Sequence, residues 1–365
     1  MSLFIIALLI VALLTWSNLW VRWVLPQISA EMTTDSTSIA HGEAFNVHIT
    51  IRNTARLPAP YVHCEVLLPQ GLSLVPLDEA TDQNKPLAVA LSLKSREVVT
   101  VTFRLYGIRR GVHRLHEFRI KLSDGWTPKR HDLTLQFYRQ ITVHPALISH
   151  TGTAERDPQP LGTVTRMRKW YATSLDWVDM RPYQPGDSLR DVAWRTTARR
   201  GELIVLERAD TQTPDALVIV NVQTQATYHL GTTIATVDEV LEDGYWLTRE
   251  LLQNGARVSL YTNAIQYGKK KSAHPRFLTI TGPLAKATDH KLGHALGQLS
   301  PYAFFSFARL IEIARLTERT PTRVIVVTAY EDADSARQLA ELRKMGHTVA
   351  VHHLTDAGAA EEVAQ

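Results

Sequence analysis

The stretch that decides the fold is residues 216–222, ALVIVNV, an apolar run with the length of one buried strand. An amphipathic helix is predicted next, over residues 237–252, and Asn254-Gly255 ends it. Strands and helices then alternate, with strands predicted at 257–261, 277–280, 324–328 and 348–354 and helices at 304–316 and 333–345. This alternation predicts a Rossmann-type α/β domain over residues 214–365, with a mostly parallel sheet and helices on both faces.

Upstream of this domain the hydrophobic pattern changes to a period of two residues. Short alternating runs are separated by turn residues between positions 36 and 145, without an intervening helix. Strands are predicted at 45–51, 61–68, 87–93, 98–105, 116–122, 133–138 and 140–144. About seven short strands of this kind predict a small antiparallel, immunoglobulin-like β-sandwich, which we place at residues 29–148.

The amino-terminal segment predicts a membrane anchor. Residues 3–14 are uninterrupted apolar sequence, and the apolar character continues to position 25. About 20 residues of helix cross the hydrocarbon core of a bilayer. Trp16, Trp20 and Trp23 gather at one end of the run, as in an interfacial aromatic belt, and Pro26 ends the helix. We therefore predict a transmembrane anchor over residues 1–28, with the lipid contact through residues 3–25.

Two other interpretations of this segment fit the residues less well. A secretory signal has a basic start and a small-residue cleavage site, but no Lys or Arg precedes the run and Ile28-Ser29-Ala30 is a poor match. A buried core helix would carry a polar face, which residues 3–14 lack. Arg22, the nearby basic residue, lies on the carboxyl side. The positive-inside tendency therefore predicts a single-pass protein of the inner (cytoplasmic) membrane with its soluble part in the cytoplasm.

Composition excludes several classes of function. The 365 residues carry a formal charge of only +4, and Lys and Arg are scattered along the chain, with one local concentration at residues 166–200. Cys64 is the single cysteine, so an intramolecular disulfide is impossible, and its strand-like surroundings predict a buried, inert thiol. The sequence contains no phosphate-binding or dinucleotide-binding glycine motif and no G-x-S-x-G nucleophile elbow.

Residues 166–200 form a dense motif, RMRKWYATSLDWVDMRPYQPGDSLRDVAWRTTARR, with eight Lys or Arg and four Asp among aromatic side chains. Pro182, Pro185 and Gly186 predict a loop, followed by a short helix over 192–200 and a strand over 203–206. One interpretation is a rigid surface for a protein partner. A second is an internal clasp, which the interleaved opposite charges favour. Nucleic-acid binding is disfavoured, because the aspartates would repel phosphate.

The same residues carry a family resemblance. The pattern Tyr183-x-Pro185-Gly186-Asp187-x-x-Arg190-x-Val192-x-Trp194, then Ala198-Arg199 and Glu202-Leu203, resembles the signature of the domain-of-unknown-function 58 family. Residues 109–115, RRGVHRL, and 141–145, ITVHP, resemble two further family segments. The resemblance implies an amino-terminal membrane segment, a β-sandwich and a von Willebrand A-like domain. It also implies a scaffold or adaptor role with a MoxR-type AAA+ ATPase as partner, and no established catalytic activity.

The sequence departs from the family pattern at several positions. The family often has two membrane segments, and one is visible here. Ala193 stands where the family has an aspartate, and residues 124–128 replace a family turn. A von Willebrand A domain binds Mg²⁺ through Asp-x-Ser-x-Ser after its first strand, but the aligned positions here hold Asn221, Gln223 and Gln225. Because a hard cation usually needs a carboxylate, we expect no metal and no other cofactor, with weak Mg²⁺ binding as the alternative.

Two functional hypotheses follow. The first is a non-catalytic, membrane-anchored scaffold or adaptor whose contact motif lies in the connecting segment 149–213. Its partner-binding residues are Trp177, Arg181, Tyr183, Pro185, Gly186, Asp187, Arg190, Trp194, Arg199 and Glu202. The alternative is a hydrolase whose site is assembled between the domains from Asp176, Asp179, Asp187 and histidines.

Overall fold

The protein is a mixed α/β molecule with several sheets. The computed structural model describes residues 15–76, 86–127, 129–148, 177–183, 192–208, 215–228, 233–267, 276–280, 284–318 and 322–354. The chain divides into two compact units. The first, the sandwich unit, holds Met1–Ile148, Ile265–Lys271 and His290–Ser300, and the second, the α/β unit, holds the remaining residues. The boundaries expected at 28, 148 and 213 stay predictions.

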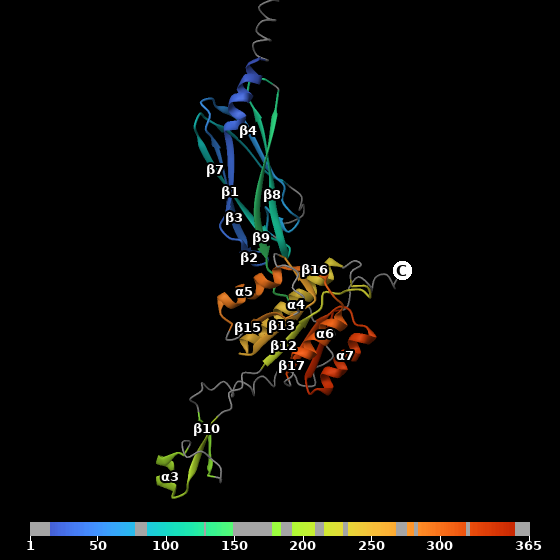
Figure 1. Ribbon diagram of the computed structural model, residues 1–365. Helices are drawn as coiled ribbons and strands as arrows, with labels where there is room; N and C mark the ends of the chain where they lie inside the picture. The colour runs from blue at the N-terminus through green and yellow to red at the C-terminus, as the bar shows by residue number, and fades with distance from the viewer. Residues whose placement is uncertain are drawn as a thin grey trace, which may run out of the picture. The chain divides into compact units, whose positions relative to one another are not determined.

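Two β-sheets form the main part of the sandwich unit (Figure 1). One sheet has the order β1-β3-β7-β5, from Ile28–Thr34, Ala44–Asn53, Val98–Gly107 and Leu72–Ser73. The other has the order β2-β9-β8-β4-β6, from Ser38–Ile39, His131–Val143, Gly111–Ser123, Ala59–Val66 and Leu87–Leu93. The pairs are antiparallel except β2 with β9, which is parallel. Alternate side chains of the two sheets form one apolar core.

The strand predictions were correct in type and incomplete in extent. Residues 133–138 and 140–144 were expected as two strands, but a single strand, β9, covers both. Its register against β8 shifts between Leu115 and Glu117, and this irregularity accounts for the break in the alternating pattern. The strand Ile28–Thr34 was not predicted, because its polar residues obscure the periodicity.

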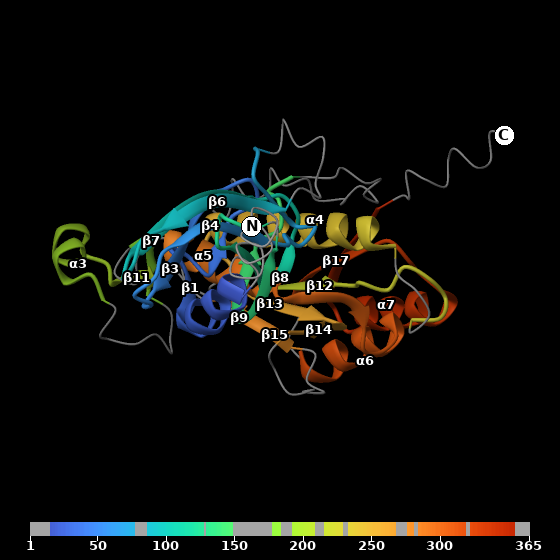
Figure 2. The ribbon, with the colours of Figure 1, turned by 90° about the horizontal axis from the view of Figure 1, so that it is seen from above.

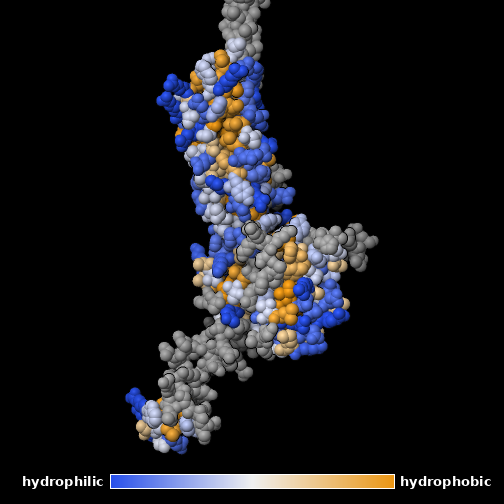
Figure 3. All heavy atoms as spheres, in the orientation of Figure 1, coloured by the Kyte–Doolittle hydropathy of each residue, from blue (hydrophilic) through white to orange (hydrophobic). Residues whose placement is uncertain are grey.

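A helix over residues 15–24 precedes the first strand and ends in the 3₁₀ turn Leu25–Gln27. Trp20 was expected in an interfacial aromatic belt, but it is buried in the sandwich core together with Val24. Trp16 and Trp23 remain exposed. Figure 3 shows hydrophobic side chains exposed among hydrophilic ones at this end of the sandwich.

Within the described part of the chain, no helix is both long and apolar enough to cross a membrane. Residues 3–14, which hold most of the expected span, lie outside the described residues.

The α/β unit is built on a five-stranded sheet of order β15-β13-β12-β17-β18. The strands are Arg276–Ile280, Arg257–Thr262, Asp215–Val220, Arg323–Thr328 and Thr348–His353. All pairs are parallel except β13 with β15. Helix α4 (Ile234–Gln253) covers one face, and α6 (Phe307–Thr317) and α7 (Ala333–Lys344) cover the other (Figure 2). The predicted alternation of strands and helices is confirmed.

The elements that were not predicted also include α5 (Lys286–Gly297) and the paired strands β14 (Ala264–Gln266) and β16 (Leu299–Ala303). Gly293 lowers the helix propensity of this segment. On α5, His294 Nδ1 lies 2.8 Å from Ser38 Oγ, and the ring of His290 stands edge-on to His144, with centroids 5.0 Å apart.

The described part of the dense motif forms a small hairpin. Strand β10 (Trp177–Pro182) pairs antiparallel with β11 (Ile204–Arg208), and α3 (Trp194–Arg200) precedes β11. The expectation of a loop was therefore wrong for residues 177–182. The predicted helix and second strand are confirmed, with Gly201 ending α3 at a φ of 73°, a left-handed conformation that glycine adopts readily.

Candidate functional site

The carboxyl ends of three neighbouring strands bring buried polar side chains together. Asn263 follows β13, Asn221 follows β12, and Thr328 is the last residue of β17. Because β12 is parallel to both of its neighbours, these ends lie at one edge of the sheet. Gln223 lies on the loop after β12, and all four residues are at most 1% exposed. This edge is where ligands commonly bind in open α/β sheets.

Asn221 is the centre of a hydrogen-bond network. Its Nδ2 donates to Thr328 Oγ1 over 2.8 Å, and its Oδ1 accepts from the Gln223 backbone N–H over 3.0 Å. Asn263 Nδ2 donates to the same Oδ1 over 2.8 Å, and Asn263 Oδ1 accepts from the Val222 N–H over 3.0 Å. Backbone donors therefore fix the orientation of both amides.

Gln223 extends this network to the start of α6. Its Oε1 accepts from the Phe307 backbone N–H over 2.8 Å, and its Nε2 donates to the Gln225 carbonyl over 2.8 Å. Phe307 is the first residue of α6, so Gln223 satisfies one of the N–H groups that a helix leaves free at its amino terminus. Gln225 is exposed and contributes its backbone carbonyl. We call Asn221, Gln223, Asn263 and Thr328 the amide network.

The amide network does not fit a divalent cation. Its acceptor oxygens already receive N–H groups, and it contains no carboxylate. The two acidic residues that follow β17 have other contacts. Glu331 pairs with His353 over 2.7 Å, and Asp332 caps α7 by accepting from the Ser335 N–H over 2.7 Å. Over the described ranges, no group of three or more His, Cys, Asp or Glu is arranged to hold a metal.

Asn263 was missed in the sequence. The family pattern covers the positions after the first strand, whereas Asn263 follows the second strand and belongs to no motif. Its signal was topological: in a parallel sheet, a polar residue directly after an adjacent strand faces the same edge. At the start of α7, Asp332 and Ser335 form a reciprocal capping box.

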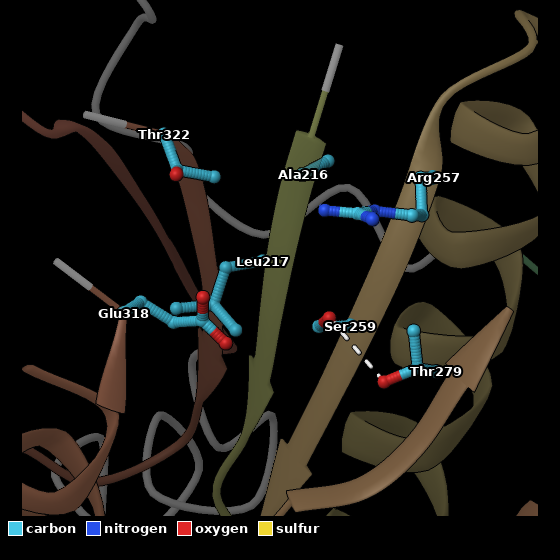
Figure 4. A pocket seen from close by; sticks show the side chains of 7 residues that line it. All are labelled: Ala216, Leu217, Arg257, Ser259, Thr279, Glu318 and Thr322. Atoms are coloured by element: carbon cyan, nitrogen blue, oxygen red, sulfur yellow. Dashed lines mark hydrogen bonds between the residues drawn. The ribbon is translucent and has the colours of Figure 1, made fainter. Parts of the chain in front are cut away.

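A separate pocket lies at the opposite edge of the same sheet (Figure 4). Its volume is about 130 Å³, below the several hundred Å³ typical of ligand pockets. Its polar lining includes Arg257, Glu318 and the pair Ser259–Thr279, whose hydroxyls lie 3.4 Å apart. The Tyr261 hydroxyl donates to Glu318 over 2.9 Å. Ser259 therefore has Thr279 as a hydroxyl partner, and the Glu318 carboxylate accepts from Tyr261.

The motif hairpin, defined as β10, α3 and β11, presents part of the predicted partner-binding set. Trp194 is 63% exposed at the start of α3, and Arg199 and Glu202 are also exposed. Tyr183 is half-buried, and its backbone N–H donates to the Leu203 carbonyl. Trp177 and Arg181 lie in β10, where only the backbone is described.

The remaining motif residues, Pro185, Gly186, Asp187 and Arg190, lie outside the described residues. So does Asp176, and only the backbone of Asp179 is described. The hydrolase alternative therefore gains no observation from the part of the chain that the structure describes.

Comparison with known proteins gives a family match. The family model described as "Protein of unknown function DUF58" matches residues 179–357. Among curated proteins, the "Uncharacterized protein YeaD" of Bacillus subtilis (strain 168) is 22% identical over 260 residues, which cover 71% of this chain and 61% of that protein. The chain thus spans less than two thirds of the length of this relative.

Two solved structures each resemble about a third of the chain. A CARDB domain from Pyrococcus furiosus covers 32% of this chain, with 91% of that domain matched at 12% identity and a TM-score of 0.20. An alpha-2-macroglobulin fragment from Escherichia coli covers 35% of this chain, with 18% of that fragment matched at 19% identity and a TM-score of 0.25. At these TM-scores the likeness has no bearing on function.

Proposed function

The chain belongs to the family described as "Protein of unknown function DUF58", and from this premise we propose that it is a non-catalytic, membrane-anchored protein-interaction scaffold or adaptor. It works with a MoxR-type AAA+ ATPase in the assembly or maturation of other proteins. Residues 3–25 anchor it as a single-pass protein in the inner (cytoplasmic) membrane, and the folded units lie in the cytoplasm. No nucleic acid is involved.

The amide network is the observation that carries this proposal. We take the α/β unit as von Willebrand A-like and the sandwich as immunoglobulin-like. In such an α/β domain, an ion at the strand-end edge links the domain to its partner. Here that edge is filled by neutral side chains that hydrogen-bond to one another and to α6. Partner binding is therefore independent of a metal ion.

The motif hairpin supplies the alternative contact surface. Trp194 and Arg199 are exposed on α3, and Trp and Arg are enriched among residues that dominate protein interfaces. An AAA+ ATPase that engages this surface would do so through aromatic and charged contacts. This requires no ligand at the sheet edge.

Titration calorimetry on the full-length chain in detergent tests the first half of the proposal. We expect no heat of Mg²⁺ or Mn²⁺ binding below millimolar concentration. The triple variant Asn221→Asp, Gln223→Ser, Gln225→Ser supplies a carboxylate and two hydroxyls, and we expect it to gain measurable affinity. Sub-millimolar binding by the unaltered chain, abolished by Asn221→Leu, would show ion-dependent adhesion instead.

Capture of a purified MoxR-type ATPase by the full-length chain tests the second half. We expect capture to persist in a chelating buffer and to fall at least about tenfold in the double variant Trp194→Ala, Arg199→Glu. The matched control is Leu316→Ala, Arg337→Glu, which alters exposed residues of α6 and α7 and should leave capture unchanged. Equal capture by both double variants would exclude the motif hairpin as the contact surface.

A further inference from the structure

The helix over residues 15–24 is fastened to one end of the sandwich. Trp20 is 3% exposed, and its Nε1 donates to the Pro58 carbonyl over 3.0 Å. Ser17 is 1% exposed and accepts from Thr127 Oγ1 over 3.1 Å. Ser17 and Trp20 are three residues apart and therefore lie on the same face of the helix. Their buried contacts make the helix part of the sandwich unit.

The turn that holds Ser17 also places a tryptophan beside the helix. The carboxylate of Asp124 accepts from the backbone N–H groups of Trp126 and Thr127 over 3.1 Å and 2.9 Å, which fixes the turn. Trp126 is 76% exposed. On the helix, Trp16, Leu19 and Trp23 are 44%, 48% and 60% exposed. Large apolar side chains from two separate segments are thus exposed at the same end of the unit.

Two loops bring basic side chains to this end. The Asn53 side chain donates to the carbonyls of Leu57 and Lys94, over 3.0 Å and 2.9 Å, and joins the loops at 54–58 and 94–97. The Thr54 N–H donates to the Gln27 carbonyl and joins them to the end of the helix. Exposed basic residues lie on the helix, at the end of β3, on these two loops and after the turn at 124–127: Arg22, Arg52, Arg56, Lys94, Arg96, Lys129 and Arg130.

Acidic side chains at this end are few. Asp132, two residues after Arg130 at the start of β9, is exposed. Glu97 is half-buried and accepts from the Lys94 backbone N–H over 2.6 Å, while Asp124 is 3% exposed and holds its turn. The end is therefore strongly cationic as well as aromatic. We use the name "helix end of the sandwich" for a surface made of the exposed tryptophans, Leu19 and the seven basic residues named in the preceding paragraph.

We propose that the helix end of the sandwich binds the anionic headgroup layer of a lipid bilayer, so that the sandwich itself rests on the membrane. Tryptophan prefers the interface between headgroups and acyl chains, and Lys and Arg near an anionic leaflet add favourable electrostatic free energy. In the sequence, the continuously apolar residues 3–14 directly precede this helix. The inference rests on the anchor in the proposed function and adds a second, sandwich-borne contact.

The positive charge of the helix end also indicates which leaflet of the bilayer it contacts. The cytoplasmic leaflet carries the anionic lipids that attract basic segments. A cationic end fastened directly to the anchor is therefore suited to that leaflet.

The test uses the full-length chain in liposomes of phosphatidylcholine with or without phosphatidylglycerol, containing brominated acyl chains. Cys64 is 1% exposed, so a Cys64→Ser background with Trp126→Cys allows one fluorescent label at the helix end. Tyr138→Cys, 62% exposed on β9, is the matched position away from it. We expect the label at 126 to be quenched, more strongly with phosphatidylglycerol, and the label at 138 to be unaffected.

Neutralising charge gives the decisive comparison. The triple variant Arg56→Gln, Lys94→Gln, Arg96→Gln should abolish the effect of phosphatidylglycerol on the label at 126 without releasing the chain from the vesicles. This inference is overturned, with the anchor left intact, if the protein is inserted but the label at 126 is not quenched. The same holds if its quenching is equal with and without phosphatidylglycerol. Protein that alkaline carbonate releases from the vesicles overturns the anchor and this inference together.

Discussion

Among single residues, Asn263 joins segments that are distant in the sequence, although it belongs to no sequence motif. It joins Val222, Asn221 and the Phe305 carbonyl across the ends of two strands and the start of α6. Because it is fully buried, the groups that it satisfies have no access to water.

Asn263→Leu keeps the volume and removes these hydrogen bonds. We expect it to destabilise the α/β unit by about 3 kcal/mol, since buried polar groups lose their partners. Hydrogen exchange monitored by mass spectrometry should show faster exchange in β12, β13 and α6. Gln225→Leu alters an exposed residue of the same region and should change stability by less than about 0.5 kcal/mol. Unchanged exchange in Asn263→Leu would mean that the amide network is not structural.

Asp124 has a pH-dependent role at the other unit. Burial raises the pKa of Asp124, but the hydrogen bonds from Thr127 and Trp126 together lower it by more than burial raises it. The net pKa of Asp124 is therefore below its ordinary value. The ionised form is therefore favoured in the folded state. Its contribution is fully present above the unfolded-state pKa of about 3.9 and is lost as pH falls through the folded-state pKa.

Because of this linkage, we expect the melting temperatures of the unaltered chain and of a variant without the Asp124 carboxylate to converge at low pH. Asp124→Asn should lower the melting temperature of the sandwich unit at pH 7, and the difference from the unaltered chain should shrink as pH falls below about 4. Circular dichroism between pH 7 and pH 2 measures both. A difference that stays constant over this range would show that the carboxylate charge contributes nothing to stability.

The buried thiol is the residue whose character the sequence predicted completely. Cys64 alternates with polar neighbours on β4, and this pattern alone placed it in the core. Burial raises its pKa to about 12, which keeps the thiol protonated and inert. By contrast, the partners of Trp20 lie in a loop near Pro58, and no local pattern indicates them.

Among the elements, α5 packs onto the sandwich through two glycines. A Cβ added at Gly297 would lie 2.6 Å from the Val143 carbonyl oxygen, and one at Gly293 would lie 2.5 Å from the His144 ring. The glycines therefore permit a close approach of helix and strand. The sequence suggested the opposite conclusion, because helix propensity counts against glycine and the strand that needs the space is distant in the chain.

Gly297→Ala tests this packing by the sign of its effect. In an open helix position the change would stabilise by roughly 0.5–1 kcal/mol, whereas contact with a backbone oxygen should destabilise by about 2 kcal/mol. Lys291→Ala on the exposed side of α5 is the control. The measurement is the stability of β9 and α5 during denaturation, monitored by the protection of their amide hydrogens from exchange. A Gly297→Ala variant that is more stable than the unaltered chain would refute close packing.

On the scale of the whole molecule, local periodicity predicted the two architectures. Period-two alternation predicted the sandwich strands, and strand–helix alternation predicted the parallel sheet. It could not show that His290–Ser300 belongs with the sandwich unit, because that assignment depends on contacts such as Arg110 with the Leu299 carbonyl. The amide network was visible only in part for the same reason, since adjacency of strands is a long-range property.

The membership of residues 290–300 in the sandwich unit has a consequence for biosynthesis. A ribosome that has delivered residues 1–148 has supplied every strand of the two sandwich sheets, yet the segment that packs on Val143 and His144 is still about 140 codons away. Domains usually fold in order as they emerge from the ribosome. Here the first unit to appear must wait, with one patch uncovered, until most of the second has been translated.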